Sequence, residues 1–174
     1  EAKPMPGSRD SISLGHRVRI QKSFAFQRTD SGGWQCGTTA LQPVEAGGLP
    51  TGQRPPPAVV LVDPQLGDNI GAVARAMANF GLKELRLVKP RDGWPNPDAG
   101  PAASGADIVL RDAQVFDTVA AAVADCPVVY ASTVRRRELD MPVIDPATMA
   151  AAIATSPARS AILFGPERAG LETE

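Results

Sequence analysis

Residues 59–88 constrain the fold of this chain more than any other segment. Residues 59–62 are apolar and mostly β-branched, and Asp63-Pro64 ends the run, so it predicts a strand buried on both faces. A stripe at helical spacing follows and Gly81 ends it; its members are Ile70, Val73, Ala74, Met77 and Phe80. A second strand is expected at 85–88. Strand, helix and strand in this order predict a parallel βαβ unit with a right-handed crossover.

A second face of this helix carries polar residues. Gly71, Arg75 and Asn79 recur every four residues, away from the apolar stripe. A glycine one turn before an arginine leaves room for another backbone or for a ligand. Residues 67–69 are expected to form a turn and an N-cap, which places the Asn69 amide beside free backbone N–H groups that suit an anion. A capped amphipathic helix with a solvated arginine explains the same spacing equally well.

Composition limits the possible functions. The chain has 174 residues, enough for one α/β domain and an appendage, and its net charge is −1, so any RNA contact must depend on local patches. The sequence shows no membrane span and no signal peptide, so a cytoplasmic location is expected. The two cysteines and the single histidine, Cys36, Cys126 and His16, lie too far apart in sequence for a disulfide framework or a zinc motif. With only one histidine, Ser-His-Asp and Cys-His catalysis are disfavoured. Cys126 precedes an apolar strand, which favours a role in core packing.

The first 57 residues differ from the rest of the chain. They are rich in Gly, Ser, Pro, Gln and Thr, and residues 46–57 are typical of a linker. We expect a poorly structured extension over 1–57, with one short strand possible within 18–26, and a folded domain over 58–174. The extension is mildly basic, which would aid RNA binding, but a solvated tail is the favoured interpretation.

The later elements are expected to alternate between strands and helices. Residues 89–106 are expected to form a loop, in which packing by Trp94 is favoured over base stacking. Strands are expected at 107–110, 127–130 and 160–164. Helices are expected to begin at Asp112, running through Val115, Val119 and Val123, and at Pro146.

Polar residues follow several of these strands. In an open parallel sheet, ligands bind beyond the carboxyl ends of the strands. The residues expected there are Asp63, Asn69, Gly71, Arg75, Ser132, Thr133, Gly165 and Glu167, together with the run Arg135, Arg136 and Arg137, which is either a solvated loop or a phosphate contact. No metal set, paired acids or phosphate-loop lysine occurs among them. This inventory suits a group transfer that depends on positioning, such as methyl transfer from a sulfonium donor, without selecting it over other nucleotide-binding reactions.

Two motifs carry a family resemblance. N-I-G-A-V-A-R at 69–75 and F-G-P-E-R-A-G-L at 164–171 resemble the first and second motifs of the SpoU/TrmH class of SPOUT RNA ribose 2′-O-methyltransferases, which have an α/β-knot fold. With A-S-T-V-R-R-R at 131–137, the pattern is most similar to the TrmJ branch, which methylates the tRNA anticodon loop. The resemblance covers residues 58 to 174. It implies S-adenosylmethionine as donor, a ribose 2′-hydroxyl of tRNA or else rRNA as acceptor, a homodimer with RNA bound across both subunits, and no metal or membrane partner.

The resemblance also assigns residues. Asn69 and Arg75 would serve the reacting hydroxyl and its adjacent phosphate, with Glu167 supporting them as the third catalytic residue. A guanidinium hardly deprotonates, so we expect Arg75 to stabilise charge rather than act as a base. An acid in the first turn of a helix beside Pro166 is the alternative for Glu167. The cofactor would be bordered by Ser132, Thr133, Val134 and Gly165, and the RNA by Arg135, Arg136, Arg137 and Arg168.

One part of the family pattern is not found. A third motif with Asn, Ser and Leu is expected after Leu171, where it would form the knot and part of the cofactor cleft. We therefore expect this polypeptide to lack a complete cofactor pocket and to show little activity. The alternative function is a non-catalytic RNA-binding or dimerisation module that keeps a Rossmann-like sheet without the cofactor site.

Overall fold

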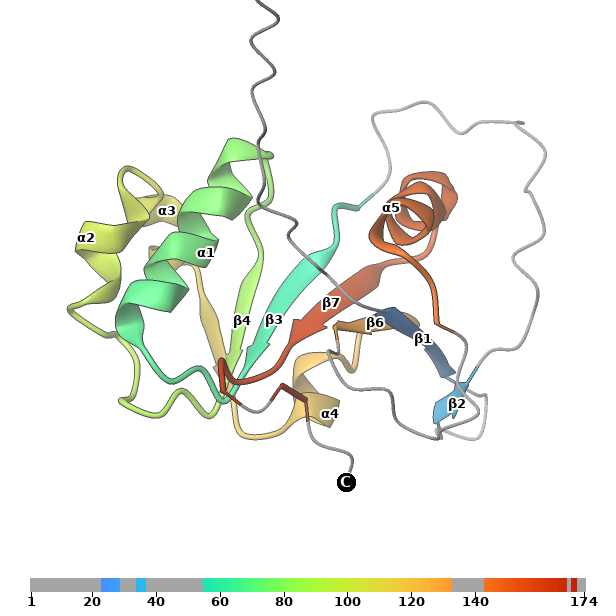
Figure 1. Ribbon diagram of the computed structural model, residues 1–174, viewed down its shortest axis with the longest axis horizontal. Coiled ribbons are helices and arrows are strands. Elements are labelled where there is room, and N and C mark those ends of the chain that lie inside the picture. Colours follow the sequence, from blue (N-terminus) through green and yellow to red (C-terminus); the bar gives the residue numbers. More distant parts are fainter. Residues whose placement is uncertain (1–22, 29–33, 37–54, 133–142, 169, 172–174) are drawn as a thin grey trace, which may run out of the picture.

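The described residues form a single mixed sheet flanked by helices (Figure 1). The computed structural model describes residues 23–28, 34–36, 55–132, 143–168 and 170–171, with the backbone alone for 23–36. The strands are β1 (Ser23–Arg28), β2 (Trp34–Cys36), β3 (Ala58–Val62), β4 (Leu85–Val88), β5 (Gln114–Phe116), β6 (Val128–Ser132) and β7 (Ser160–Phe164). Their order is β2-β1-β6-β7-β3-β4-β5. The strands from β6 to β5 pair in parallel, which confirms the predicted parallel sheet, and β1 joins β6 in antiparallel orientation.

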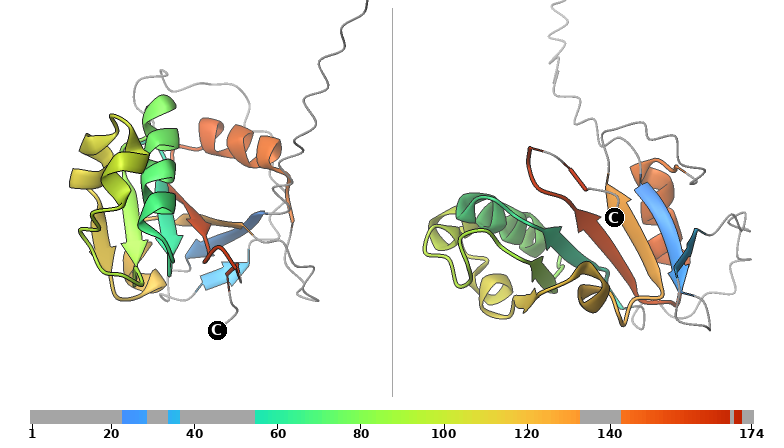
Figure 2. Two further views of the ribbon diagram at one scale, coloured as in Figure 1. Left: turned by 60° about the vertical axis from the view of Figure 1, so that its left-hand side comes forward. Right: turned by 90° about the horizontal axis from the view of Figure 1, so that it is seen from below.

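Helices cover both faces of the sheet (Figure 2). They are α1 (Gly67–Asn79), α2 (Ala99–Ala103), α3 (Asp107–Arg111), α4 (Val119–Ala122) and α5 (Pro146–Thr155). Alternate residues of β3 face opposite sides, so Val59 and Leu61 pack in the core with α1, α2 and α3, whereas Ala58 and Val60 pack with α4. No helix among the described residues is both long and apolar enough to cross a membrane.

The predicted βαβ unit is confirmed in its main features. β3 and β4 pair in parallel, and Ile70, Ala74 and Met77 of α1 are buried between them and the neighbouring helices. Gly81 follows the helix with a φ of +73°, a backbone conformation that favours glycine. Phe80 was expected in the buried stripe, but it is 84% exposed. The reason is that the helix ends at Asn79, so the Phe80 backbone leaves the helical path before its side chain can reach the sheet.

The predictions between residues 107 and 118 are wrong, whereas the predicted helix is present over Val119–Ala122. The expected strand at 107–110 is helix α3, with Asp107 in its first turn and Arg111 in its last, where both charges complement the helix dipole. The expected helix through Val115 is instead strand β5, which pairs with β4. The helix that follows is α4, which spans one turn and is capped by the Thr118 hydroxyl rather than by Asp112.

Other local predictions hold. Cys126 is fully buried and Trp94 packs against the core, as expected. Helix α5 begins at Pro146 with Asp145 as its N-cap, and the loop predicted at 89–106 also contains α2. Strands β1 and β2 come from the segment before residue 57, the first of them overlapping the strand proposed within 18–26. The division of the chain at residue 57 stays a prediction.

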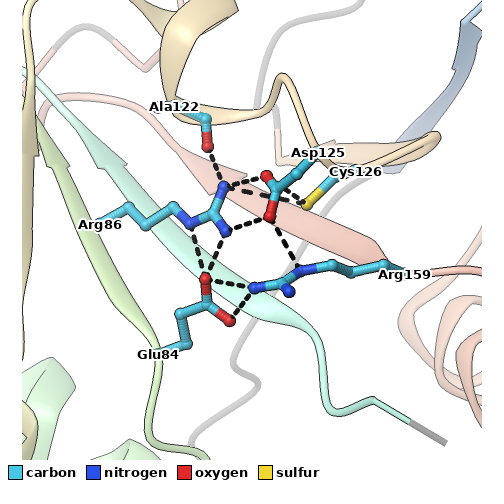
Figure 3. A network of polar contacts seen from close by, with 6 residues as sticks. All are labelled: Glu84, Arg86, Ala122, Asp125, Cys126 and Arg159. Carbon is cyan, nitrogen blue, oxygen red and sulfur yellow. Dashed lines mark hydrogen bonds and ion pairs between the residues drawn. The ribbon is translucent and has the colours of Figure 1, made fainter.

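An ionic network ties three strands together at the amino edge of the sheet (Figure 3). The buried Arg86 guanidinium contacts Asp125 through two hydrogen bonds of 2.6 and 2.8 Å, and its Nε donates to Glu84 at 2.9 Å. Arg159 pairs with both acids, with its Nε 3.1 Å from an Asp125 oxygen. Glu84, Asp125 and Arg159 lie just before β4, β6 and β7. The network therefore fixes the amino ends of these strands in relation to one another.

The close contact between α1 and α2 at Gly71 can be tested. A β-carbon at Gly71 would lie 2.2 Å from the carbonyl oxygen of Ala99. We expect Gly71→Ala to lower the free energy of unfolding by about 1–3 kcal/mol because the two helices would have to separate. Gly100→Ala in α2 meets no atom within 4 Å and should cause no loss. Urea denaturation measures both, and equal stability of the two variants would refute the contact.

The ionic network predicts a sensitivity to acid. Hydrogen bonds from Arg86 hold the pKa of Asp125 well below its usual value of 3.8, despite the opposing effect of burial. A lowered folded-state pKa contributes stability that is present above the unfolded-state pKa and is lost as the pH falls toward the folded-state pKa. We expect stability to drop below about pH 4 and Asp125→Asn to weaken this dependence. Asp117→Asn, at an exposed position, is the control for thermal unfolding from pH 7 to pH 2.

Candidate active site

The topology gathers several loops at the carboxyl edge of the sheet. β3 leads through α1 to β4 on one side, whereas β7, the last strand in the chain, pairs in parallel on its other side, so the sequence order of the strands is broken between β7 and β3. Ligands of open parallel sheets bind at such a switch point. We define the carboxyl edge as residues 63–66 after β3, 89–93 after β4 and 165–168 with 170–171 after β7, together with Ser132 at the end of β6.

The Glu167 carboxylate joins two of these loops. Its Oε1 accepts a hydrogen bond of 2.8 Å from the Asn69 side-chain amide, and its Oε2 accepts one of 3.0 Å from the Gln65 backbone N–H. In Figure 1 the segment after β7, drawn in red, turns toward the end of β3 and the start of α1. The two sequence motifs thus meet directly, although Asn69 and Glu167 are 98 residues apart.

This contact corrects the predicted N-cap. α1 begins at Gly67, and its N-cap residue Leu66 makes no side-chain capping bond. Asn69 lies within the first turn, and Glu167 of the other motif adds a negative charge at this helix end to that of Asp68. The alternative that placed Glu167 in the first turn of its own helix is wrong, since residues 165–168 are not helical.

The contact also fixes the orientation of the Asn69 amide. An ionised carboxylate can accept hydrogen bonds but cannot donate them, so the Asn69 NH₂ group must face Glu167. The Asn69 carbonyl oxygen then makes no hydrogen bond to any other described residue. It is available as an acceptor for a hydroxyl group of a ligand.

Glu167 is held in its ionised form. Burial opposes ionisation, but hydrogen bonds from the Asn69 amide and the backbone of Gln65 and Leu66 outweigh it and lower the pKa of Glu167 below its usual value. At neutral pH the carboxylate therefore orients Asn69 and is not a proton donor.

Arg75 does not join this pair within one chain. Its side chain is exposed, and it makes no hydrogen bond or ion pair with any other described residue. Six residues separate it from Asn69, which in an α-helix is about 9 Å along the axis and about 120° around it. The structure thus brings Asn69 and Glu167 together and leaves Arg75 on another side of α1.

The glycines have packing roles that the sequence left open. Gly71 is buried against the backbone of α2, so another backbone, not a ligand, occupies the space beside it. A β-carbon at Gly165 would lie 2.3 Å from the Leu171 backbone nitrogen, so Gly165 lets the loop after β7 fold back on itself. Its predicted place beside a cofactor remains untested.

The remaining predicted site residues divide into two groups. Ser132 is half-buried at the end of β6, next to β7, and Arg168 is exposed beside Glu167 at the carboxyl edge. Outside the described residues lie Thr133, Val134, Arg135, Arg136 and Arg137. The roles assigned to both groups stay predictions. The described part of the chain contains no cluster of His, Cys, Asp or Glu side chains that could hold a metal ion.

Sequence reasoning missed two residues of this edge. The Gln65 backbone N–H donates a hydrogen bond to Glu167, and the Gln65 side-chain oxygen lies 3.4 Å from Nη1 of Arg91. The Arg91 backbone N–H also donates to the Pro64 carbonyl at 3.1 Å. Each residue lies three positions after the end of a predicted strand, and that placement was the available signal.

Residues 56–174 match the model of the SpoU rRNA Methylase family. The chain belongs to this family. Its match includes both motifs that meet at the carboxyl edge.

Individual SpoU-family proteins are similar to this chain. The tRNA (cytidine/uridine/adenosine-2′-O-)-methyltransferase TrmJ of Pseudomonas aeruginosa is 41% identical over 119 residues, covering 67% of this chain and 46% of that protein. The crystal structure of TrmJ from Z. mobilis ZM4 has 65% identity and a TM-score of 0.67, covering 68% of this chain and 53% of that one. A probable methylase from Haemophilus influenzae has 33% identity and a TM-score of 0.61, covering 66% of this chain and 48% of that one. The chain spans about half the length of the curated relatives it matches.

An exchange of side chains tests the contact between the motifs. Asn69→Asp places two carboxylates 2.8 Å apart, and we expect a loss of about 1–3 kcal/mol in unfolding free energy at pH 7. Adding Glu167→Gln should recover most of this loss because the new amide can donate to the new carboxylate. The deficit of the single variant should also shrink as the pH falls toward 4. A double variant less stable than Asn69→Asp would contradict the contact.

Proposed function

We propose that this chain acts in S-adenosylmethionine-dependent methylation of a ribose 2′-hydroxyl in tRNA. The observation that carries the proposal is the contact between Asn69 and Glu167, because it joins both family motifs at the edge where parallel sheets bind ligands. The similarity to two TrmJ proteins, one of them named as a tRNA 2′-O-methyltransferase, supports tRNA over rRNA as substrate.

The residues would act by positioning the acceptor. Glu167 holds the Asn69 amide so that its free carbonyl oxygen can accept a hydrogen bond from the ribose hydroxyl. That bond would orient an oxygen lone pair toward the methyl group. Arg75 would neutralise the phosphate next to the ribose, and Arg168 and the run 135–137 would contact more of the RNA.

The cofactor would lie at the carboxyl ends of β6 and β7. Ser132, Thr133, Val134 and Gly165 would hold S-adenosylmethionine, which supplies an already activated methyl group. Ser132 and Gly165 fit this role because they leave adjacent parallel strands and carry small side chains or none. A hydroxyl and free backbone groups at such strand ends suit the polar edge of a nucleoside.

Arg75 supports a homodimeric arrangement. Within one chain it lies on a different side of α1 from Asn69 and has no partner among the described residues, so a second subunit would complete the set around RNA. Sedimentation measurements on the purified protein test this arrangement. A monomer that is fully active would exclude it.

A direct assay tests the proposed function. The full natural chain is incubated with labelled S-adenosylmethionine and unmodified tRNA, and the nucleotides are separated after digestion. Label in a 2′-O-methyl nucleotide is the expected result, and its absence would reject the proposal. Calorimetry with S-adenosylmethionine separates the alternative: RNA binding without cofactor binding would favour a non-catalytic RNA-binding or dimerisation module.

Arg75 offers the sharpest test of a residue role. We expect Arg75→Ala to lower methyl transfer by about 100-fold or more, because a cation that stabilises charge at the reacting centre is lost. Thermal unfolding should be unchanged, since the side chain is exposed and unpaired among the described residues. Asn79→Ala, one turn further along α1, is the control and should keep full activity. Equal activity of the two variants would refute the role of Arg75.

A further inference from the structure

Arg91 belongs to the carboxyl edge, although no family motif contains it. Its backbone N–H donates to Pro64, and its Nη1 lies 3.4 Å from the Gln65 side-chain oxygen. Gln65 in turn receives the Glu167 carboxylate at its backbone. Arg91 is therefore fixed to the same loop that holds the Asn69–Glu167 pair, and its side chain remains 48% exposed.

The guanidinium of Arg91 has free donors. Its Nε and Nη2 bind the two oxygens of Asp92 at 2.9 and 2.8 Å, which occupies one edge of the fork. Asp92 takes one N–H of Nη2 and Gln65 takes one of Nη1, so each of these nitrogens keeps a second N–H with no partner among the described residues. N–H groups on two nitrogens of one guanidinium can bind the oxygens of a phosphate.

The acidic residues around Arg91 favour its protonated, positively charged form. The hydrogen bonds to Asp92 raise the pKa of Arg91, as do the charges of Glu167 and Asp63 nearby. An anionic RNA backbone would meet three carboxylates at this edge, so a fixed cation between them removes part of the repulsion.

We propose that Arg91 binds a backbone phosphate of the RNA at the carboxyl edge, a different phosphate from the one assigned to Arg75, and that Asp92 holds its guanidinium in place while weakening that attraction. This inference rests on the proposed function and extends it to a residue outside both motifs. It gives Arg91 and Asp92 opposite effects on RNA affinity.

The chain contains a matched control for this pair. Arg111 contacts its neighbour Asp112 at 2.9 Å through Nε, the same local arrangement, but it lies at the end of α3. Asp112 is the acid that raises the pKa of Arg111. Glu167 and Asp63, which act on Arg91, are not among its causes. Substitutions there change the same charges away from the carboxyl edge.

The experiment measures tRNA affinity of the full chain by fluorescence anisotropy at several salt concentrations. Arg91→Gln should weaken binding by about twofold to fivefold, the range for an exposed ion pair. It should also reduce the slope of log K against log salt by about 0.7–0.9, the loss of one phosphate contact. Asp92→Asn should tighten binding by a similar factor, whereas Arg111→Gln and Asp112→Asn should leave it unchanged.

The outcomes separate this inference from the proposed function. If the parent protein methylates tRNA but Arg91→Gln and Arg111→Gln bind equally well, the assignment of Arg91 is wrong and the proposed function stands. If the parent protein neither binds nor methylates tRNA, both fail. Equal thermal unfolding of all four variants and the parent confirms that the comparison reports binding. A loss of affinity in Asp92→Asn would also overturn the inference.

Discussion

The Glu167 carboxylate lies at the start of α1, a helix whose N-cap residue makes no side-chain capping bond, and adds its charge to that of Asp68 in the first turn. The carboxylate reaches the Gln65 backbone across 102 residues of chain and the Asn69 amide across 98. Glu167 can reach this position only when β7 pairs with β3, because that pairing places the loop after β7 beside the start of α1. The geometry of the candidate site therefore depends on completion of the sheet, not on the βαβ unit alone.

The two edges of the sheet differ in how completely their polar side chains are paired. At the amino edge, Arg86 and Arg159 share Glu84 and Asp125, and removing one partner of such a network leaves a poorly solvated charge. At the carboxyl edge, Asn69 and Arg91 use only part of their hydrogen-bonding capacity within the described residues. Rigid strands anchored at one end can thus present unsatisfied polar groups at the other, which a binding site requires.

Sequence patterns predicted correctly those helices and strands whose periodicity and end residues fit only one kind of secondary structure. The strand at 59–62 with its following helix, the strand at 160–164 and the helix after Asp145-Pro146 all carry clear periodicity or end residues. Residues 107–110 are apolar enough for a strand or a helix, and the choice depends on which segment pairs with β4. Strand β5 is three residues long and largely exposed, so its own sequence gives little evidence of that pairing. The N-cap predicted within residues 67–69 is wrong for a related reason. The hydrogen-bond partner of Asn69 is Glu167, which is remote in sequence and could not be inferred from the local pattern.

If RNA binds at the carboxyl edge as proposed, the charge distribution there determines how it is recognised. The chain carries a net charge of −1, and Arg91 and Arg168 lie at this edge beside Asp63, Asp92 and Glu167. Charges of opposite sign this close cancel at distances beyond about 10 Å in physiological salt. Long-range attraction would then contribute little to encounter with RNA. Recognition would then depend on direct contacts, whose geometry is set by the acidic side chains of this edge. RNA would bind tightly only when its acceptor hydroxyl is also correctly aligned.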